Sequence, residues 1–186
     1  DTPYGGGVGM VMKVDVLHRA IQHAKSSVIL SNAKNLKDPS SRLRRTQDDT
    51  IKQKVILLSA SGKPFRQHIA KEYSQLDHLI LVCGHYEGVD DRIKHYIDED
   101  ISNGDFVLTG GEIPAMLITD SVVRLIGGVI TEGATDDESF SQNGDILLEY
   151  PHYTKPQIYD GHEVPEILRR AHPHRRRSAC TTFLAA

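Results

Sequence analysis

The stretch of sequence that decides the fold spans residues 54–83 and reads KVILLSASGKPFRQHIAKEYSQLDHLILVC. Its two ends, 54–59 and 79–83, are short apolar runs bounded by small or glycine-rich segments, as in strands that are buried on both faces. Between them, residues 64–73 start with proline, which is favoured at the first position of a helix. Apolar residues follow at a helical spacing of four: Phe65, Ile69 and Tyr73. This strand-helix-strand order predicts a parallel sheet and an α/β fold.

Two further elements are predicted downstream. Residues 106–108 are a short apolar run and form a candidate third strand. Residues 112–126 have the spacing of a helix with one apolar stripe. The stripe consists of Met116, Ile118, Val122, Val123 and Ile126.

The composition excludes several classes of protein. The 186 residues carry 22 Lys+Arg against 25 Asp+Glu, and this net charge of -3 does not suit a protein that coats nucleic acid. With 39% hydrophobic and 25% charged residues, the chain lies in the globular range. Cys83 and Cys180 lack metal-ligand spacing and are too few for a disulfide framework, so we expect free thiols, no structural metal and a cytoplasmic location. The most apolar stretch, 115–130, is interrupted by Asp120 and Arg124, and we expect no membrane span.

Charge is distributed unevenly along the chain. Residues 34–54 hold seven Lys or Arg against three Asp without apolar periodicity, which indicates a basic surface excursion. Residues 131–149 hold six acidic residues and no Lys or Arg, which is typical of a mobile linker. Residues 169–177 are rich in arginine. The two basic segments would contact RNA phosphates and make RNA binding sensitive to salt.

Three glycine-rich segments are candidates for ligand binding. Tyr4-Gly-Gly-Gly-Val-Gly-Met10 lets a flat ligand or a phosphate approach the main chain, although a structural turn explains it equally well. Gly84-His-Tyr-Glu-Gly-Val-Asp-Asp-Arg92 follows a predicted strand, at the edge where open α/β sheets bind ligands; for Arg92 itself a salt bridge is the preferred interpretation. Residues 101–112 expose main-chain groups that can bind the edges of an adenine nucleoside, with hairpin turns as the alternative.

Taken together, these segments resemble the bacterial tRNA (guanine-N1)-methyltransferase (TrmD) family of the SPOUT superfamily. The motifs that carry the resemblance are Tyr4-Gly-Gly-Gly-x-Gly-Met10, Leu81-Val-Cys-Gly-x-Tyr-Glu-Gly-Val-Asp90, Ile101-Ser-x-Gly-Asp105, Leu108-x-Gly-Gly-Glu112, Glu138-Ser-Phe140 and Tyr150-Pro-His-Tyr-Thr-Lys-Pro156. Several motifs in the same order are far more specific than any single glycine loop.

The resemblance implies an α/β fold in which a parallel-sheet SPOUT methyltransferase domain has a C-terminal trefoil knot and is followed by part of a small helical C-terminal domain. Residues 1–130 would be the knotted domain, without its N-terminal part, and would bind S-adenosylmethionine. Residues 131–149 would be the flexible acidic linker, and residues 150–186 an incomplete tRNA-binding portion. The resemblance also implies a homodimer that acts on tRNA. It is compatible with a magnesium requirement, although the sequence contains no recognisable metal cluster.

The same resemblance assigns the residues of the site. The cofactor would contact Leu58, Ser59, Gly84, Tyr86, Glu87, Gly88, Asn103, Gly104, Asp105, Phe106, Val107, Leu108, Gly110, Gly111 and Pro114. The target nucleotide would contact Tyr4, Gly5, Gly7 and Gly9.

The implied reaction, methylation of N1 of the guanine immediately 3′ of the anticodon, needs a base and a cation. N1 carries a hydrogen, and its removal develops negative charge on O6. By the resemblance, Glu138 is the candidate base, with Asp137 as the alternative, and Arg124 is the candidate cation. Closure of the linker on RNA would bring Glu138 to the target base. Without the resemblance, a solvated linker charge and a helix-surface salt bridge would be the preferred interpretations of Glu138 and Arg124.

Three other functions are left open. The first is a SPOUT RNA methyltransferase with a different target. The second is a noncatalytic RNA-binding module, suggested by residues 34–54 and the arginine-rich segment. The third, a phosphate-binding enzyme built on residues 5–9, is disfavoured because no P-loop lysine follows the glycines.

Overall fold

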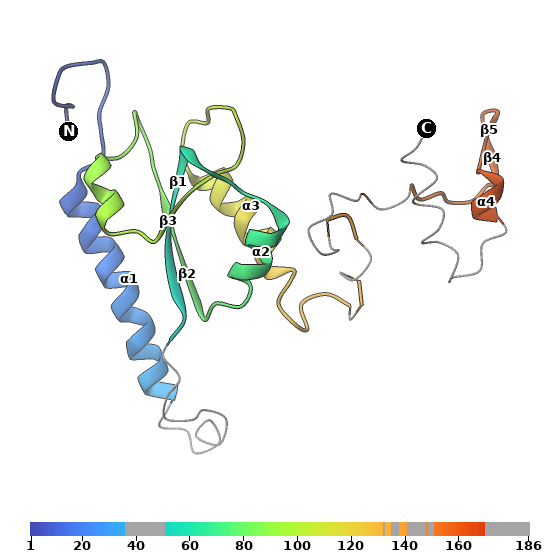
Figure 1. The fold of residues 1–186 in the computed structure, drawn as a ribbon, viewed down its shortest axis with the longest axis horizontal. Helices are drawn as coiled ribbons and strands as arrows, with labels where there is room; N and C mark the ends of the chain where they lie inside the picture. The colour runs from blue at the N-terminus through green and yellow to red at the C-terminus, as the bar shows by residue number, and fades with distance from the viewer. Residues whose placement is uncertain (36–50, 132, 135–137, 141–147, 149–150, 170–186) are drawn as a thin grey trace. The chain divides into compact units, whose positions relative to one another are not determined.

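The computed structural model describes residues 1–35, 51–131, 133–134, 138–140, 148 and 151–169 (Figure 1). The chain divides into two compact units, residues 1–129 and 130–186. Several groups of residues for which the sequence made predictions lie outside the described residues. They are the central part of the basic segment (36–50), most of the predicted linker (132, 135–137, 141–147 and 149) with the alternative base Asp137, and residues 170–186, which include most of the arginine-rich segment and Cys180.

A three-stranded parallel sheet forms the centre of the first unit. Its strands are β1 (Gln53–Pro64), β2 (His78–Cys83) and β3 (Glu99–Ser102), in the order β2-β1-β3. β1 therefore lies between the other two strands and is paired on both sides. Because all three strands run in the same direction, their carboxyl ends meet at one edge of the sheet, at the top of the first unit in Figure 1.

Helices cover both faces of this sheet (Figure 1). On one face lie α1 (Val14–Asn35) and the short 3-10 helix η2 (Asp91–His95). On the other face lie α2 (Gln67–Tyr73) and α3 (Glu112–Val123). The arrangement is the layered α/β architecture that the strand-helix-strand order predicts.

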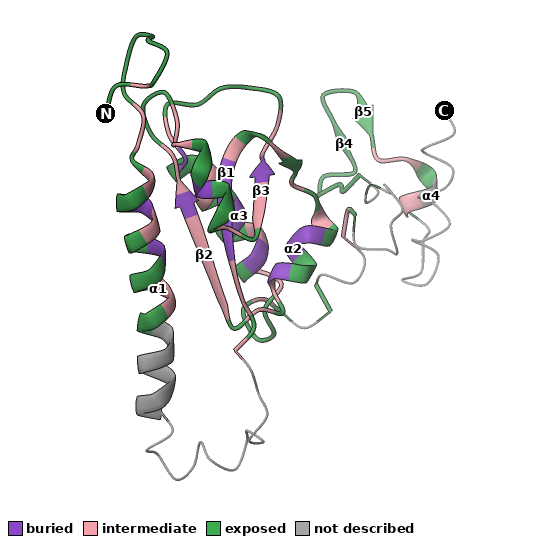
Figure 2. Ribbon diagram, turned by 60° about the vertical axis from the view of Figure 1, so that its left-hand side comes forward, coloured by how far each residue is buried: buried purple, intermediate pink, exposed green. Residues whose placement is uncertain are grey.

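The alternation of side chains along β1 builds the two halves of the core. Successive residues of a strand point to opposite faces of the sheet. Val55 and Leu57 accordingly pack on the α1 side, and Ile56 and Leu58 pack on the side of α2 and α3. All four side chains are buried, and the colours of Figure 2 show the buried residues on the strands and on the inner faces of the helices. Burying such an aliphatic side chain contributes about 1.5–3 kcal/mol to stability.

The third strand is not the one that the sequence predicts. Residues 106–108 form no strand, and β3 is the more polar segment Glu99–Ser102. Only Ile101 supplies a large apolar side chain to the core from this strand. The three residues of the expected strand line a pocket, and their main chain is not paired in the sheet.

The boundary between β1 and α2 also differs from the expectation. Pro64 is still paired with Ser102, so β1 extends through the residue that was predicted to begin the helix. Arg66 is extended, with φ of -140°, and the helix begins at Gln67. Proline is tolerated here because it stands at the very end of the strand.

Residues 59–62 bulge from β1. The pairing of β1 with β3 shifts its register between Leu58 and Lys63, which leaves the intervening residues outside the regular ladder. Gly62 lies so close to β3 that a β-carbon at this position would be 2.4 Å from the main-chain nitrogen of Ile101. A bulge of this kind redirects side chains at the end of a strand.

The helices correct two further expectations. The helix α1 was not predicted, and with β1 it includes both ends of the predicted 34–54 surface excursion. Within the predicted stripe of α3, Ile118 and Val122 are buried, whereas Met116 is 71% exposed and Val123 is 40% exposed. Among the described residues, no helix combines the length and apolarity needed to cross a membrane.

The second unit contains a small hairpin and a short helix. The strands β4 (Ile158–Tyr159) and β5 (His162–Glu163) are antiparallel, and α4 (Glu166–Arg169) follows them. Arg169 reaches back to Glu163, with 3.2 Å between Nη2 and Oε2. This ion pair connects the end of the described chain to the hairpin.

Candidate functional site

A pocket of about 430 Å³ lies in the first unit at the edge of the sheet where the parallel strands end. Three parts of the chain contribute to its wall: residues 57–61 of β1, residues between 84 and 94 after β2, and residues between 101 and 114 from β3 to the first turn of α3. Its volume is within the range of small-molecule sites, about 300–1,000 Å³. This edge is also where open α/β sheets bind their ligands.

The pocket brings together nearly all the residues that the sequence assigned to the cofactor. Those in its wall are Leu58, Ser59, Gly84, Tyr86, Glu87, Gly88, Asn103, Gly104, Phe106, Val107, Leu108, Gly110, Gly111 and Pro114. Asp105 is the exception, since it is exposed and does not contribute to the wall.

Sequence reasoning missed the other residues of the wall. They are Leu57, Ala60, Ser61, His85, Val89, Asp91, Lys94, Ile101, Ser102 and Thr109. His85 and Asp91 lie within the second glycine-rich segment, and the strand-end position of that segment was a usable signal. Ser61 reaches the pocket through the bulge in β1, and Lys94 belongs to η2, where its Nζ lies 2.6 Å from Asp91 Oδ1. Neither the bulge nor this helix is visible as a sequence pattern.

The segment that follows β3 returns to the end of β2 and joins two walls of the pocket. The main-chain nitrogen of Gly111 donates a hydrogen bond to the carbonyl oxygen of Gly84 at 2.9 Å, and Gly110 forms an antiparallel bridge with His85. A β-carbon on Gly111 would lie 2.7 Å from the α-carbon of Cys83. Glycine is therefore required sterically at this crossing.

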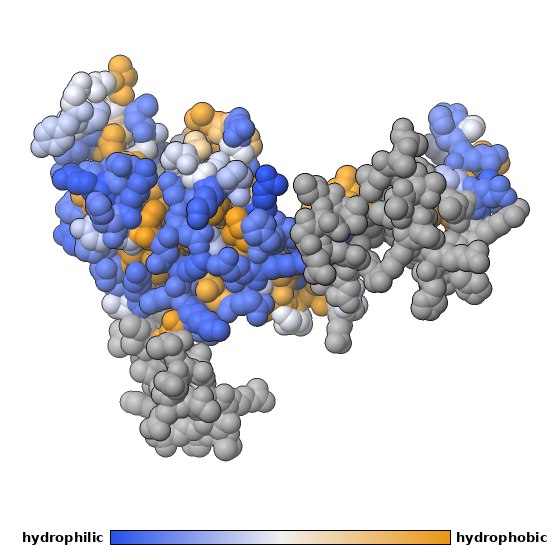
Figure 3. Space-filling view, in the orientation of Figure 1, coloured by the Kyte–Doolittle hydropathy of each residue, from blue (hydrophilic) through white to orange (hydrophobic). Residues whose placement is uncertain are grey.

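Exposed apolar side chains line the part of the wall that residues 101–114 contribute. Phe106, Val107 and Leu108 are 56%, 91% and 40% exposed, and Tyr86 on the second wall is 63% exposed. Figure 3 shows hydrophobic surface at the top of the first unit, over the loop that follows β3. Tyr86 also has a φ of 61°, an uncommon conformation for a residue other than glycine. Exposed apolar groups beside a cavity and local backbone strain both mark ligand sites.

The glycine-rich segment 4–10 is hydrogen-bonded at one end to the part of the pocket wall that follows β2. Four of its glycines have positive φ angles: Gly5 at 88°, Gly6 at 80°, Gly7 at 127° and Gly9 at 99°. Its end is fixed by main-chain hydrogen bonds of 3.0 Å from Glu87 to Met10 and from Met12 to Gly88. Tyr4, at its other end, is fully exposed. The residues predicted to contact the nucleotide therefore lie on a loop that is connected to the pocket.

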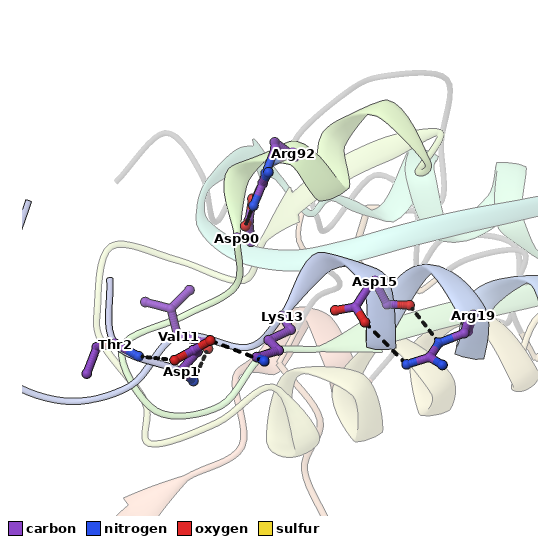
Figure 4. A network of polar contacts seen from close by, with 8 residues as sticks. All are labelled: Asp1, Thr2, Val11, Lys13, Asp15, Arg19, Asp90 and Arg92. Carbon is purple, nitrogen blue, oxygen red and sulfur yellow. Dashed lines mark hydrogen bonds and ion pairs between the residues drawn. The ribbon is translucent and has the colours of Figure 1, made fainter. Parts of the chain in front are cut away.

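Polar contacts lie at the base of the glycine-rich loop 4–10 and in the loop that follows β2 (Figure 4). The main-chain atoms of Asp1 and Val11 exchange hydrogen bonds of 2.8 and 2.9 Å, and Lys13 is 3.2 Å from the Asp1 carboxylate. Arg92 donates from Nη2 to Asp90 Oδ2 at 2.5 Å, which confirms the expected salt bridge. The hydrogen bonds from Arg92 lower the pKa of the Asp90 carboxyl to about 2, so this group is ionised at neutral pH.

The two candidate catalytic residues belong to different units. Arg124 is the C-cap residue that follows α3; its main-chain nitrogen donates to Asp120 O at 3.2 Å, and the residue is half-buried. Glu138 lies in the second unit and is half-buried as well. Each of them has an interaction partner. Their roles as cation and base stay predictions.

Fold and site together define a class of protein: an α/β protein whose strand-end loops form a pocket in the size range of small-molecule sites. The family model described as tRNA (guanine-1)-methyltransferase TrmD matches residues 1–179. The chain belongs to this family.

Curated relatives of the chain carry the name tRNA (guanine-N(1)-)-methyltransferase. The protein of Malacoplasma penetrans is 46% identical over 168 residues, which are 90% of this chain and 62% of the relative. The protein of Acholeplasma laidlawii is 46% identical over 173 residues, covering 92% of this chain and 60% of the relative. The protein of Desulfitobacterium hafniense is 44% identical over 176 residues, covering 95% and 58%. The chain thus spans about three fifths of the length of these relatives.

Proposed function

We propose that this protein transfers a methyl group from S-adenosylmethionine to N1 of the guanine immediately 3′ of the anticodon in tRNA, in the cytoplasm, and thereby maintains the reading frame. The observation that carries the proposal is the pocket at the strand ends, whose wall contains 14 of the 15 residues assigned to the cofactor by the family motifs. Membership of the methyltransferase family supports the same reaction.

The residues of the pocket suit S-adenosylmethionine. The exposed apolar side chains of Phe106 and Leu108 offer surface to a flat purine, and main-chain groups around Gly84 and Gly110 offer donors and acceptors to its edges. Ser59 adds a hydroxyl at the start of the bulge in β1. When bound, S-adenosylmethionine supplies an electrophilic methyl group on a sulfonium sulfur. The walls of the pocket would orient it and keep water away from it.

The protein's own groups would move the proton and stabilise the charge. The Glu138 carboxylate accepts the proton from guanine N1, which makes N1 nucleophilic. The Arg124 guanidinium stabilises the negative charge that develops on O6. Tyr4 offers an exposed aromatic ring to the RNA, and stacking on aromatic rings is a common way of holding an unpaired base.

A magnesium requirement is a prediction of the family resemblance alone. Among the described residues, no group of three or more His, Cys, Asp or Glu side chains is arranged to hold a metal ion. Within the pocket wall, the Asp91 carboxylate is paired with Lys94. We therefore assign no step of the reaction to a metal.

A homodimer is supported by the outer face of α3. Its apolar residues recur at helical spacing and are exposed by 63%, 71%, 46% and 40%: Ile113, Met116, Leu117 and Val123. They lie on the opposite side of the helix from the buried Ile118 and Val122. We propose that a second copy of the chain covers this face, because exposed apolar stripes of this kind are typical of subunit interfaces.

The trefoil knot would be formed by the segment that follows β3. This segment passes from the end of β3 to the end of β2, where Gly111 crosses close to Cys83 and Gly84. We further propose that residues 131–149 link the knotted domain to a tRNA-binding portion at 150–186.

Labelled S-adenosylmethionine and two tRNA transcripts test the proposed function. The transcripts differ only at the position 3′ of the anticodon, which is guanine in one and adenine in the other. We expect label in the guanine transcript alone. Label in both would favour a related RNA methyltransferase with another target, and RNA binding without cofactor binding would favour a noncatalytic module.

A further inference from the structure

Lys94 and Asp91 form an ion pair in the wall of the pocket. Both belong to η2, and Lys94 Nζ lies 2.6 Å from Asp91 Oδ1. Their side chains are 47% and 83% exposed and line the pocket, so both charged groups are open to a ligand. An exposed ion pair adds little to stability, and a change at either residue should therefore leave the protein folded.

The pair belongs to a charged part of the pocket. From 101 to 114, the residues of the wall are uncharged, and Phe106 and Leu108 give this part an apolar surface. Among the described residues, the Asp, Glu and Lys side chains of the wall are Glu87, Asp91 and Lys94, all from the segment after β2. Two carboxylates against one ammonium group give this segment a surplus of negative charge. The pocket thus has an uncharged part and a charged part.

Lys94 carries a positive charge that is available to a ligand. The hydrogen bond to Asp91 and the charge of Asp91 raise the pKa of Lys94, and the charge of Asp100 raises it further, which outweighs the effect of desolvation. The ammonium group is therefore ionised at neutral pH. It has three hydrogens to donate, so it can bind a second acceptor and keep its contact with Asp91. The Asp91 carboxylate can likewise accept from more than one donor.

A zwitterion is the chemical group that fits this arrangement. The ammonium and carboxylate groups of an amino acid lie close together, and beside a Lys–Asp pair each of them meets the opposite charge. S-adenosylmethionine joins an uncharged nucleoside to such an amino-acid group through a sulfonium. Its net positive charge is also complementary to the surplus of negative charge in this part of the wall.

We propose that Lys94 and Asp91 bind the amino-acid end of the cofactor, with Lys94 Nζ donating to the α-carboxylate and the Asp91 carboxylate accepting from the α-ammonium group. The proposal rests on the proposed function, since it assumes that the pocket holds the cofactor. The pair then selects ligands that carry an amino-acid group over nucleosides that lack it.

Calorimetric titration with two ligands tests the proposal. The first ligand is S-adenosylhomocysteine, and the second is 5′-methylthioadenosine, which keeps the nucleoside and the thioether but lacks the amino-acid group. We expect the unmodified protein to bind the first at least about tenfold more tightly. Lys94→Met should lower the affinity for S-adenosylhomocysteine about tenfold and leave that for methylthioadenosine within about twofold. Asp91→Asn should have the same selective effect, because the amide oxygen carries no charge to hold the ammonium group.

Two control variants separate this contact from general effects. Lys52→Met is the same chemical change at an exposed position outside the wall. His95→Gln alters an exposed residue of η2 that is also outside the wall. Both should leave the ratio of the two affinities unchanged.

Four outcomes would overturn the inference alone. An equal loss of affinity for both ligands in Lys94→Met would mean that the residue only supports the wall. An unchanged ratio in Lys94→Met and Asp91→Asn would mean that the pair only stabilises η2, and a changed ratio in one of them would contradict a paired role. If the unmodified protein binds both ligands equally, the amino-acid end is not recognised although the pocket is a cofactor site. Binding of neither ligand would refute the proposed function together with the inference.

Discussion

Gly9 faces the side chain of Glu87 so closely that a β-carbon on Gly9 would lie 2.5 Å from Glu87 Cγ. Glu87 belongs to the wall of the pocket, and Gly9 belongs to the glycine-rich loop. The loop assigned to RNA and the wall assigned to the cofactor are thus in direct contact. A change in one of them is transmitted to the other by packing.

Gly9→Ala should impair methyl transfer more than an equivalent change elsewhere in the loop. The added methyl group must displace Glu87, and displacing a group of an active site by about an ångström can cost as much as 100-fold in rate. Gly6→Ala is the matched control, because Gly6 also has a positive φ but a β-carbon there would meet no other atom within 4 Å. We expect kcat/KM to be at least about tenfold lower in Gly9→Ala than in Gly6→Ala, measured as label transfer to tRNA. Equal values would show that the contact has no functional effect.

Gly111→Ala should destabilise the first unit. Its β-carbon would lie 2.7 Å from the α-carbon of Cys83 and 3.0 Å from the nitrogen of Gly84, and main-chain atoms cannot move aside as a flexible side chain can. We expect the free energy of unfolding in urea to fall by about 1–3 kcal/mol. Gly127→Ala, where no neighbouring atom lies within 4 Å, is the control and should change it by less than about 1 kcal/mol.

Lys54 and Glu99 should make stability depend on pH. Lys54 Nζ contacts the Glu99 carboxylate and lies 2.5 Å from Glu72 Oε1. The hydrogen bonds with Glu72 and Glu99 raise the pKa of Lys54. Burial pushes the pKa of Glu99 upward, but the hydrogen bond and the charge of Lys54 outweigh burial, so this pKa is lowered overall. The Glu99 contribution is therefore present above pH 4.5 and lost as the pH falls through the folded-state pKa, whereas the Lys54 contribution is present below pH 10.5 and lost at higher pH.

Lys54→Met tests this linkage. At pH 7 the variant leaves Glu99 without its cation, and we expect the free energy of unfolding to fall by about 1–3 kcal/mol. The difference from the unmodified protein should shrink as the pH falls from 4.5 towards the lowered folded-state pKa of Glu99, because Glu99 becomes protonated over this range. Lys52→Met, at an exposed position, is the control and should have little effect at either pH. A difference that does not vary between pH 3 and pH 7, by urea unfolding, would contradict the assignment.

Met116→Glu should dissociate the proposed dimer. Placing a carboxylate in the middle of the apolar face of α3 would desolvate a charge without a partner. Val16→Glu, at a 50% exposed apolar position of α1, is a control for added charge alone. Light scattering after size-exclusion chromatography should give the mass of two chains for the control and of one chain for Met116→Glu. A monomeric unmodified protein would refute the proposed interface.

Glu138→Gln should abolish methyl transfer without weakening cofactor binding. The amide has a similar shape but cannot accept the N1 proton, so we expect the single-turnover rate to fall about 100-fold or more. Asp160→Asn is the control in the second unit, since asparagine tolerates the positive φ found at this position. Full activity of Glu138→Gln, with unchanged affinity for S-adenosylhomocysteine, would exclude this residue as the base.

The central strands could be predicted because strands that are buried on both faces consist of apolar residues, and such runs are recognisable in the sequence. β1 and β2 contain nearly continuous apolar runs. A strand that is buried on both faces needs such a run, because successive side chains enter the core on opposite sides of the sheet. The short edge strand β3 was missed because its one strongly buried apolar residue, Ile101, stands among polar ones. Residues 106–108 carry a stronger strand signal and line the pocket instead. A local run of apolar residues indicates that the side chains are buried in some way. It does not distinguish burial in a sheet from burial against a ligand.

By itself, the sequence determined the α/β class, the two central strands and the glycine-rich segments that are shared with the family. Only the tertiary structure decided which distant groups meet. It placed Gly111 against Cys83, Gly9 against Glu87, and the Asn103 amide beside Pro114. The physical reason is that strand composition reflects burial, a property of one segment. Contacts such as these depend on how separate segments pack, and no single segment encodes them.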